Sequence, residues 1–121
     1  MKRLDIIIPY ERISQLNELL HKHKVGGMTF YDVKGRGRSK NEPVHIGTGV
    51  MQYVPEFGAR TKVEILVPDS QVKPMIDDIL KTVTTDPVSD SKIFVYDVSE
   101  AYDMGTKKSG DAALYLTAID R

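Results

Sequence analysis

The apolar residues of this 121-residue chain fall into two successive units with the same predicted order of elements. In the first unit, a β-branched run at 4–8 predicts a buried strand that stops at Pro9. Apolar residues then recur at helical spacing over 13–20, and the glycines at 26–27 fit the end of that helix. A second strand is predicted over 29–34, so the first unit reads strand, helix, strand.

The second unit repeats this order. Residues 63–67 alternate between apolar and polar as a half-buried strand does, and residues 72–83 carry an apolar stripe at helical spacing. A cap at 69–70 is expected to start this helix, because Pro74 is tolerated only near a first turn. Residues 93–98 form the fourth predicted strand. The repeat predicts an α+β, ferredoxin-like double βαβ fold, with two helices on one face of a mainly antiparallel sheet.

Composition indicates one globular domain. Hydrophobic residues make up 40% of the chain and charged residues 28%, which argues against disorder. The 17 basic and 17 acidic residues cancel, so an anion site must be local rather than a basic coat for nucleic acid. No apolar run is long enough to span a membrane and no secretory leader is evident, so we expect a cytoplasmic protein. The single domain 1–121 divides into a core at 1–35 and 60–98, a long loop at 36–59 and a C-terminal tail at 99–121.

A glycine-spaced basic segment joins the second predicted strand to the long loop. From Lys34 to Lys40 every second residue is cationic, and in extended backbone these side chains point the same way. Gly35 and Gly37 between them let a ligand approach the main chain closely. This geometry suits a polyanion, and the alternative is a solvated hairpin arm whose glycines serve only turns.

Three blocks of the sequence together resemble the PII signal-transduction family. They are residues 26–40, 62–69 and 92–98, and they occur in the family's order. PII proteins are small trimeric sensors of nitrogen and energy status that bind adenine nucleotides between subunits. The resemblance therefore implies a homotrimer that signals rather than catalyses. It also implies a target protein, such as an ammonium channel, a metabolic enzyme or a transcription regulator, and no direct membrane insertion.

The resemblance implies a cleft between subunits for an adenine nucleotide: ADP, AMP or ATP. Ile7 and Thr29 fall beside the base, and Lys92 falls on the phosphates from the adjoining subunit. The other implied contacts lie along the ribose and phosphates, at the base of the long loop and before the last strand: Gly35, Gly37, Arg38, Ser39, Arg60, Ser89, Asp90 and Ser91.

This chain departs from the family pattern at several of these places. Ser39 replaces a glutamine that helps to hold magnesium and 2-oxoglutarate, and a hydroxyl lacks the paired donor and acceptor of an amide. Arg60 replaces a lysine, and residues 85–91 replace a glycine-rich loop. Asp103 and Gly105 stand where the family has two phosphate-gripping arginines. We therefore expect weaker binding of ATP than in ordinary PII proteins and a poor response to 2-oxoglutarate and magnesium.

The long loop carries two further expectations. Tyr53 aligns with a loop tyrosine that is uridylylated in some bacterial PII proteins, and partner contact is the favoured interpretation of this aromatic residue. Because the loop is long and glycine-punctuated, it is expected to be mobile in the free protein and to be cut first by proteases.

No metal or catalytic site is predicted. His21 and His23 are two residues apart on a predicted helix, so they diverge, and surface histidines are the favoured interpretation. Asp77 and Asp78 lie on a helix where solvation is expected, and no spacing indicates a catalytic triad or carboxylate pair.

Two other function classes remain open. The missing arginines fit a divergent PII-like trimeric scaffold that has lost nucleotide sensing. The basic loop alone supports a nucleic-acid-binding ferredoxin-like domain, but the aromatic-rich strands with which such sheets stack bases are not recognised in the sequence. The apolar residues at 112–116 are expected to dock on the sheet or on a neighbouring subunit.

Overall fold

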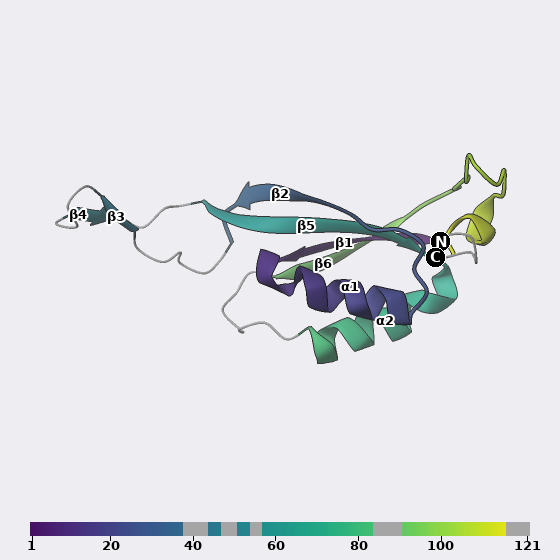
Figure 1. Cartoon of the computed structure of the whole chain (residues 1–121), viewed down its shortest axis with the longest axis horizontal. Helices are drawn as coiled ribbons and strands as arrows, with labels where there is room; N and C mark the ends of the chain where they lie inside the picture. The colour runs from purple at the N-terminus through teal and green to yellow at the C-terminus, as the bar shows by residue number, and fades with distance from the viewer. Residues whose placement is uncertain (38–43, 47–50, 54–56, 84–90, 116–121) are drawn as a thin grey trace.

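The structure is a computed structural model, and it describes residues 1–37, 44–46, 51–53, 57–83 and 91–115. Within these ranges the chain follows the predicted double βαβ order (Figure 1). The elements are β1 (Lys2–Ile8), a 3-10 turn η1 (Tyr10–Arg12), α1 (Ile13–Lys22), β2 (Thr29–Gly35), β3 (Val44–Ile46), β4 (Met51–Tyr53), β5 (Gly58–Val67), α2 (Asp69–Thr82), β6 (Lys92–Asp97) and a 3-10 turn η2 (Gly110–Ala113).

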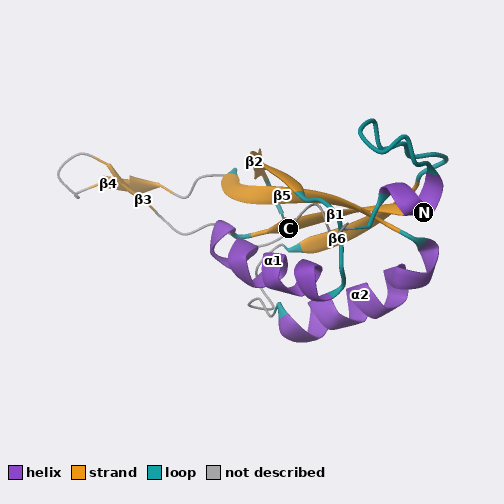
Figure 2. Ribbon diagram, turned by 45° about the vertical axis from the view of Figure 1, so that its right-hand side comes forward, coloured by secondary structure: helices purple, strands orange, loops and turns teal. Residues whose placement is uncertain are grey.

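A four-stranded antiparallel sheet forms the centre of the molecule. Its strand order is β2-β5-β1-β6, and β1 pairs with both β5 and β6. Both α-helices cover the same face of this sheet, and no α-helix of the described residues lies on the other face (Figures 1 and 2). The predicted α+β ferredoxin-like arrangement is therefore confirmed. β3 and β4 pair with each other inside the long 36–59 connection, most of which lies outside the described residues.

The hydrophobic core lies between the sheet and the helices. In β5 alternate residues are buried, as the two-residue period of a strand requires, and in β1 Leu4, Ile6 and Ile8 face the same core. On α2 the apolar stripe predicted over 72–83 buries Met75 and Ile79, whereas Leu80 is exposed. Burial of each such aliphatic side chain stabilises the folded state by about 1.5–3 kcal/mol relative to leaving it exposed to water. The core residues are Leu4, Ile6, Ile8, Ile13, Leu16, Leu19, Leu20, Val63, Ile65, Val67, Met75, Ile79 and Val83.

The end of α1 differs from the expected glycine stop. The residue with left-handed backbone is Lys24, at φ 60°, two positions before the glycines. Gly26 is required for another reason: a Cβ there would lie 2.5 Å from the Leu114 carbonyl oxygen, to which the Gly26 N–H donates at 2.9 Å. Leu114 is buried, so the C-terminal segment packs against its own chain. Of the two expected arrangements, packing on the same domain or on a neighbouring subunit, the structure shows the first.

The start of α2 also differs from the expectation. Pro68 occupies the N-cap and no side chain caps the helix, so the predicted role of residues 69–70 is wrong. Asp69 instead binds the N-terminal ammonium of Met1 at 2.8 Å, which together with the helix dipole favours its charged form. Pro74 lies inside the helix rather than in its first turn. Among the described residues, no helix is long and apolar enough to cross a membrane.

Candidate functional site

A groove of about 370 Å³ lies at the Gly35 end of β2, where the basic segment begins. Cross-strand pairing builds it: Ile7 of β1 stands opposite Lys62 on one side and Lys92 on the other. This register could not be derived from the sequence, because Ile7 and Lys92 are far apart in the chain. The cationic groove, as we name it, is lined by Ile7, Val33, Lys34, Gly35, Arg36, Gly37, Gly58, Arg60, Lys62, Lys92 and Phe94.

Positive charge dominates the cationic groove. Of the described residues that line it, five are Lys or Arg and none is Asp or Glu. Arg60 donates from Nη1 to the Ala59 carbonyl oxygen at 2.8 Å, but its Nε is buried without a hydrogen-bond partner. A buried donor without an acceptor is costly, so Arg60 is suited to an anionic ligand. A hydrogen bond with Tyr31, and then the charge of Asp5, raise the pKa of Lys62 above its ordinary value.

The structure brings five of the predicted site residues together in this groove: Ile7, Gly35, Gly37, Arg60 and Lys92. Within one chain Lys92 stands beside Ile7, because the two residues are partners in the β1–β6 ladder. Which subunit supplies Lys92 to a nucleotide site between subunits stays a prediction. Ser91 is not in the groove but lines an apolar hollow between α2 and β6. Arg38, Ser39, Ser89 and Asp90 lie outside the described residues.

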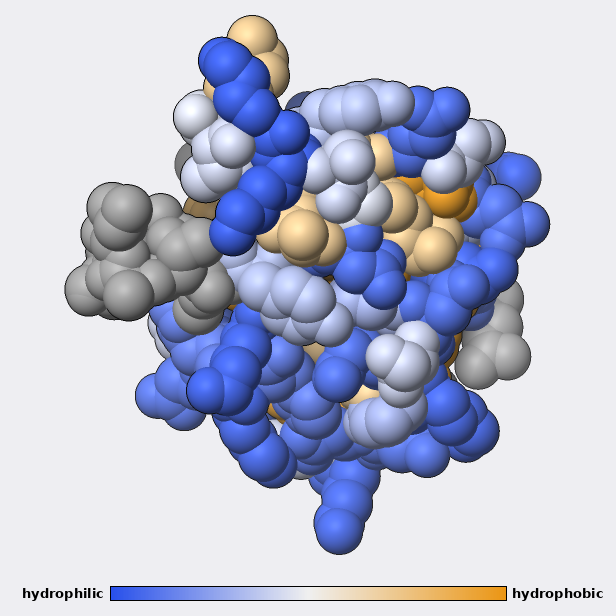
Figure 3. Space-filling model, turned by 90° about the vertical axis from the view of Figure 1, so that its right-hand side faces the viewer, coloured by the Kyte–Doolittle hydropathy of each residue, from blue (hydrophilic) through white to orange (hydrophobic). Residues whose placement is uncertain are grey.

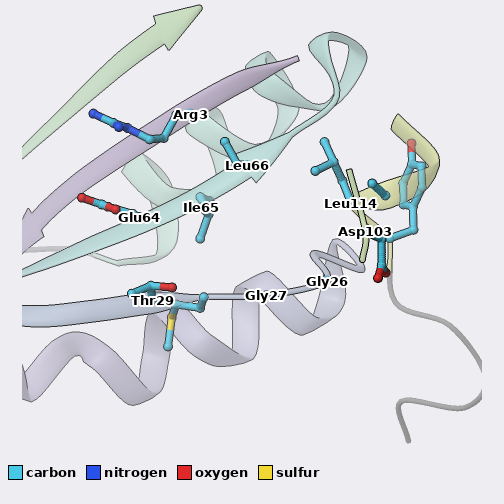
Figure 4. Close-up of a pocket in the computed structure, with 12 residues that line it drawn as sticks. Arg3, Gly26, Gly27, Thr29, Glu64, Ile65, Leu66, Asp103 and Leu114 are labelled. Atoms are coloured by element: carbon cyan, nitrogen blue, oxygen red, sulfur yellow. The ribbon is translucent and has the colours of Figure 1, made fainter. Parts of the chain in front are cut away.

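Thr29 lies at the opposite end of β2, in a second pocket of about 420 Å³. Figure 4 shows Arg3, Glu64 and Thr29 on one side of this Thr29 pocket and Asp103 with Leu114 on the other. Ile7 does not line it, so within one chain Ile7 and Thr29 lie in separate pockets. The full lining is Arg3, Gly26, Gly27, Met28, Thr29, Glu64, Ile65, Leu66, Asp103, Ala113, Leu114 and Tyr115.

The charges of the Thr29 pocket are mixed. The Tyr31 hydroxyl donates to Glu64 Oε2 at 2.7 Å. Asp103 Oδ1 accepts from the backbone N–H groups of Gly105 and Thr106, at 2.9 and 3.3 Å, so it stabilises its own turn. Neither Lys107 nor Lys108 lines the pocket. Arg3 is its one described cation, and it is already bound to a carboxylate.

That carboxylate is Asp5, a buried group on the helix-free face that sequence analysis missed. Its oxygens lie 3.0 Å from Arg3 Nε and 3.4 Å from Lys62 Nζ, while the Arg3 guanidinium stacks 4.4 Å from the centre of the Tyr96 ring. A buried carboxylate between two cations is compensated rather than isolated. The available signal was an acidic residue inside a continuous apolar strand.

Aromatic side chains also lie on this face, contrary to the sequence interpretation. Tyr31 faces Lys62, and Phe94 and Tyr96 stand opposite Asp5 and Arg3 across the β1–β6 ladder. Each of the three rings is more than two-fifths exposed. These exposed rings on the helix-free face are the kind of feature with which nucleic-acid-binding sheets stack bases, so the strand residues do not exclude nucleic-acid binding.

A polar cluster joins α1 to α2 where the sequence predicted solvated side chains. His23 Nε2 lies 2.7 Å from Asp78 Oδ2, Lys22 Nζ lies 3.1 Å from the same oxygen, and Thr82 Oγ1 donates to Oδ1 at 2.9 Å. His23, then Thr82 and Lys22, hold the pKa of Asp78 far below its usual value. The His23 and Asp78 side chains are largely buried, so the interpretation of both as solvated surface residues is wrong. Within the described residues no three His, Cys, Asp or Glu side chains are grouped to hold a metal.

Comparisons with known proteins agree with this architecture. The sequence profile described as nitrogen regulatory protein P-II matches residues 1–108. Nitrogen regulatory protein P-II 1 of Escherichia coli K12 is 36% identical over 114 residues, covering 94% of this chain and 100% of the relative. Nitrogen regulatory protein P-II of Klebsiella oxytoca is 35% identical with the same coverage. The solved structure of B. subtilis GlnK has a TM-score of 0.72 and 25% identity, covering 93% of this chain and 97% of that one.

The fold and these matches define a class of small regulatory proteins. The chain belongs to the nitrogen regulatory protein P-II family. Its function is that of a PII-like signal-transduction regulator in nitrogen metabolism.

Proposed function

We propose that three copies of this chain assemble and that each cationic groove binds a phosphate-bearing anion, such as ADP, AMP or ATP. The chemistry of the groove is the observation that carries the proposal: five cations, no described carboxylate and a buried Arg60 Nε without a partner. Phosphate oxygens would satisfy that donor. Each charge-assisted hydrogen bond to such a ligand contributes about 1.5–3 kcal/mol.

Two subunits would contribute to each site. The family resemblance places both Ile7 and Thr29 beside the base, yet they line separate pockets of one chain. A ligand that touches both must therefore lie between the cationic groove of one subunit and the Thr29 pocket of the next. The exposed aromatic rings of the helix-free face also favour assembly, because a contiguous apolar sheet face is normally covered.

The Thr29 pocket would add little attraction for phosphate. Arg3 is held by Asp5, and Asp103 adds a negative charge where the family has an arginine. A triphosphate loses most from this deficit, so ADP and AMP should bind at least as tightly as ATP. The exchange of the usual glutamine for Ser39 supports a weak response to magnesium and 2-oxoglutarate.

Signalling would proceed by differential binding. An effector that binds more tightly when the 36–59 segment has one arrangement shifts the population toward that arrangement, and a target protein recognises it. Candidates by family are an ammonium channel, a metabolic enzyme or a transcription regulator. No catalytic step is needed for this role.

Calorimetry with ADP tests the proposal. The wild-type protein should bind one ADP per subunit, and Arg60→Ala should weaken binding by about tenfold or more. Lys73→Ala removes an equally charged but highly exposed α2 residue and should leave binding unchanged. If ADP, AMP, ATP and inorganic phosphate all fail to bind, the anion site is wrong, and the trimeric scaffold without nucleotide sensing becomes the better explanation.

Light scattering tests the assembly separately. A trimer of this 13.6 kDa chain should scatter as a particle of about three times that mass at micromolar concentration. A monomer at every concentration would refute both the trimer and the site shared between subunits.

A further inference from the structure

A third pocket, of about 780 Å³, lies where α1 begins, on the face of the sheet that carries the helices. One wall is the segment that enters η1, and the other is formed by the end of β2 and the start of β5. These segments meet at the end of the sheet from which the long loop departs (Figures 1 and 2). The Asp32 pocket, as we name it, is lined by Pro9, Tyr10, Glu11, Asp32, Val33, Lys34, Ala59, Arg60 and Thr61.

The register of the sheet places the polar side chains of this pocket. Asp32 pairs with Thr61 in the β2–β5 ladder, and Thr61 pairs with Ile8 in the β1–β5 ladder. Because Thr61 and Ile8 are buried beneath the helices, Asp32 also lies on the helix-bearing face. Lys34 is two residues further along β2 and points the same way, so its Cα lies about 6.5 Å from that of Asp32.

Charges of both signs line the Asp32 pocket without neutralising one another. Glu11, Asp32 and Lys34 are exposed, and within the described ranges none of them forms an ion pair or a side-chain hydrogen bond. Thr61 is only 1% exposed, and in the same ranges its hydroxyl forms no hydrogen bond. Buried polar side chains nearly always have a partner, so this hydroxyl and these charges are available to a ligand.

This arrangement discriminates between ligands by charge. The carboxylates of Glu11 and Asp32 repel a simple anion, and the cations of Lys34 and Arg60 repel a simple cation. A small molecule that carries both charges is instead attracted at both ends. An α-amino acid has this composition, because its ammonium and carboxylate groups are attached to the same carbon and fit between side chains of opposite sign.

We propose that the Asp32 pocket binds an α-amino acid. The ammonium of the ligand lies against Asp32 and Glu11, and its carboxylate faces Lys34 and accepts a hydrogen bond from the Thr61 hydroxyl. Because the charged side chains are exposed, each ion pair contributes little, and we expect a Kd on the order of 1 mM. The pocket lies within one chain, so the inference goes beyond the proposed trimer and phosphate site and depends on neither.

Amide NMR titrations with three matched small molecules test the proposal. L-Alanine carries both charges, propionate lacks the ammonium, and ethylamine lacks the carboxylate. L-Alanine should shift the amide signals of 32–34 and 59–61, and it should bind at least about threefold more tightly than either of the others. The signals of 101–110 should not move, because that segment projects from the opposite end of the molecule, which faces the viewer in Figure 3.

A charge-removing variant sharpens the test. Asp32→Asn should weaken L-alanine binding by about three- to tenfold, because it removes one charge-assisted contact. Asp77→Asn is the matched control, since Asp77 is an exposed carboxylate on α2 outside the pocket, and it should bind L-alanine as wild type does. Asp32 does not line the cationic groove, so Asp32→Asn should bind ADP no more weakly than wild type.

Three results would overturn the amino-acid site. They are no shift with L-alanine at about 10 mM, propionate binding as tight as L-alanine binding, and an L-alanine affinity that is unchanged in Asp32→Asn. Failure of the proposed function gives a different result: ADP would not bind, while L-alanine would still shift the signals of the Asp32 pocket.

Discussion

The two ends of strand β2 carry different chemistry. At the Gly35 end, the cationic groove gathers five basic side chains from the sheet and the basic segment. At the Thr29 end, the pocket contains Glu64, Asp103 and a single described cation, Arg3, that is bound to Asp5. The described charges at the first end suit the proposed phosphate site, whereas those at the second end are mixed in sign.

In the proposed site shared between subunits, the two halves therefore differ in charge, and they rest on different parts of the fold. The basic residues of the cationic groove lie on paired strands, so the register of the sheet fixes their positions. Asp103 and Gly105 lie in a hairpin that keeps its shape through its own hydrogen bonds. Because these bonds lie within the turn, substitutions at the exposed positions of that hairpin are expected to leave the core intact.

The largest expected effect compares the two ends directly. Lys92→Ala should weaken ADP binding by roughly 30- to 100-fold, because it removes a cation from the groove. Thr29→Val, at the other end, should weaken it by less than about tenfold, because it removes one neutral hydrogen-bonding group. Calorimetry on both variants measures this contrast. Equal losses would show that the two ends contribute alike.

A smaller effect concerns the wall of the Thr29 pocket. Gly26→Ala would place a Cβ 2.5 Å from the Leu114 carbonyl oxygen, and the resulting displacement should destabilise the fold by about 2 kcal/mol. Gly27→Ala is the matched control, since a Cβ there meets no atom within 4 Å. Denaturant unfolding of the two variants tests the docking of the C-terminal segment. If both variants unfold at the same denaturant concentration, Leu114 does not pack on Gly26.

The smallest effect concerns the polar cluster around Asp78, between α1 and α2. Asp78 binds His23, which begins the connection from α1 to Thr29. Because its pKa is lowered in the folded state, the Asp78 carboxylate stabilises the protein at pH values above the ordinary Asp pKa of about 4. This contribution is lost as the pH falls toward the folded-state pKa.

Thermal melts of Asp78→Asn should therefore show a Tm lower than wild type by about 2–5 °C at pH 7, and the difference should shrink at acid pH. Asp77→Asn is the control, because Asp77 is more exposed and is bound by Lys73 within the same helix. A Tm difference for Asp78→Asn that stayed constant down to low pH would argue against the ion-paired cluster.

The sequence predicted what depends on local periodicity. Alternation in 63–67 and the helical stripe ending at Val83 define β5 and α2, so the fold class and element order follow from them. Ile7 and Lys92 become neighbours only through the β1–β6 register, which no local pattern encodes. For the same reason the division of the site residues between two pockets was not foreseen.

Other errors came from side chains whose partners are distant in the sequence. The sequence predicted that Asp78 is a solvated carboxylate, but Lys22 and His23 at the end of α1 bind it. Gly26 reads as a helix stop, yet the C-terminal segment packs against it. Whether a carboxylate or a glycine is packed against another element depends on tertiary contacts, and a single sequence does not reveal these contacts.

The relative affinity for ATP and ADP tests the central claim most directly. Calorimetry with each nucleotide, with and without magnesium and 2-oxoglutarate, compares a ligand that needs more cations with one that needs fewer. Because the Thr29 end adds no free cation among its described residues, ATP should bind no more tightly than ADP, and 2-oxoglutarate should change ATP binding little. ATP binding that is tenfold or more tighter than ADP binding, and further strengthened by 2-oxoglutarate with magnesium, would contradict the account.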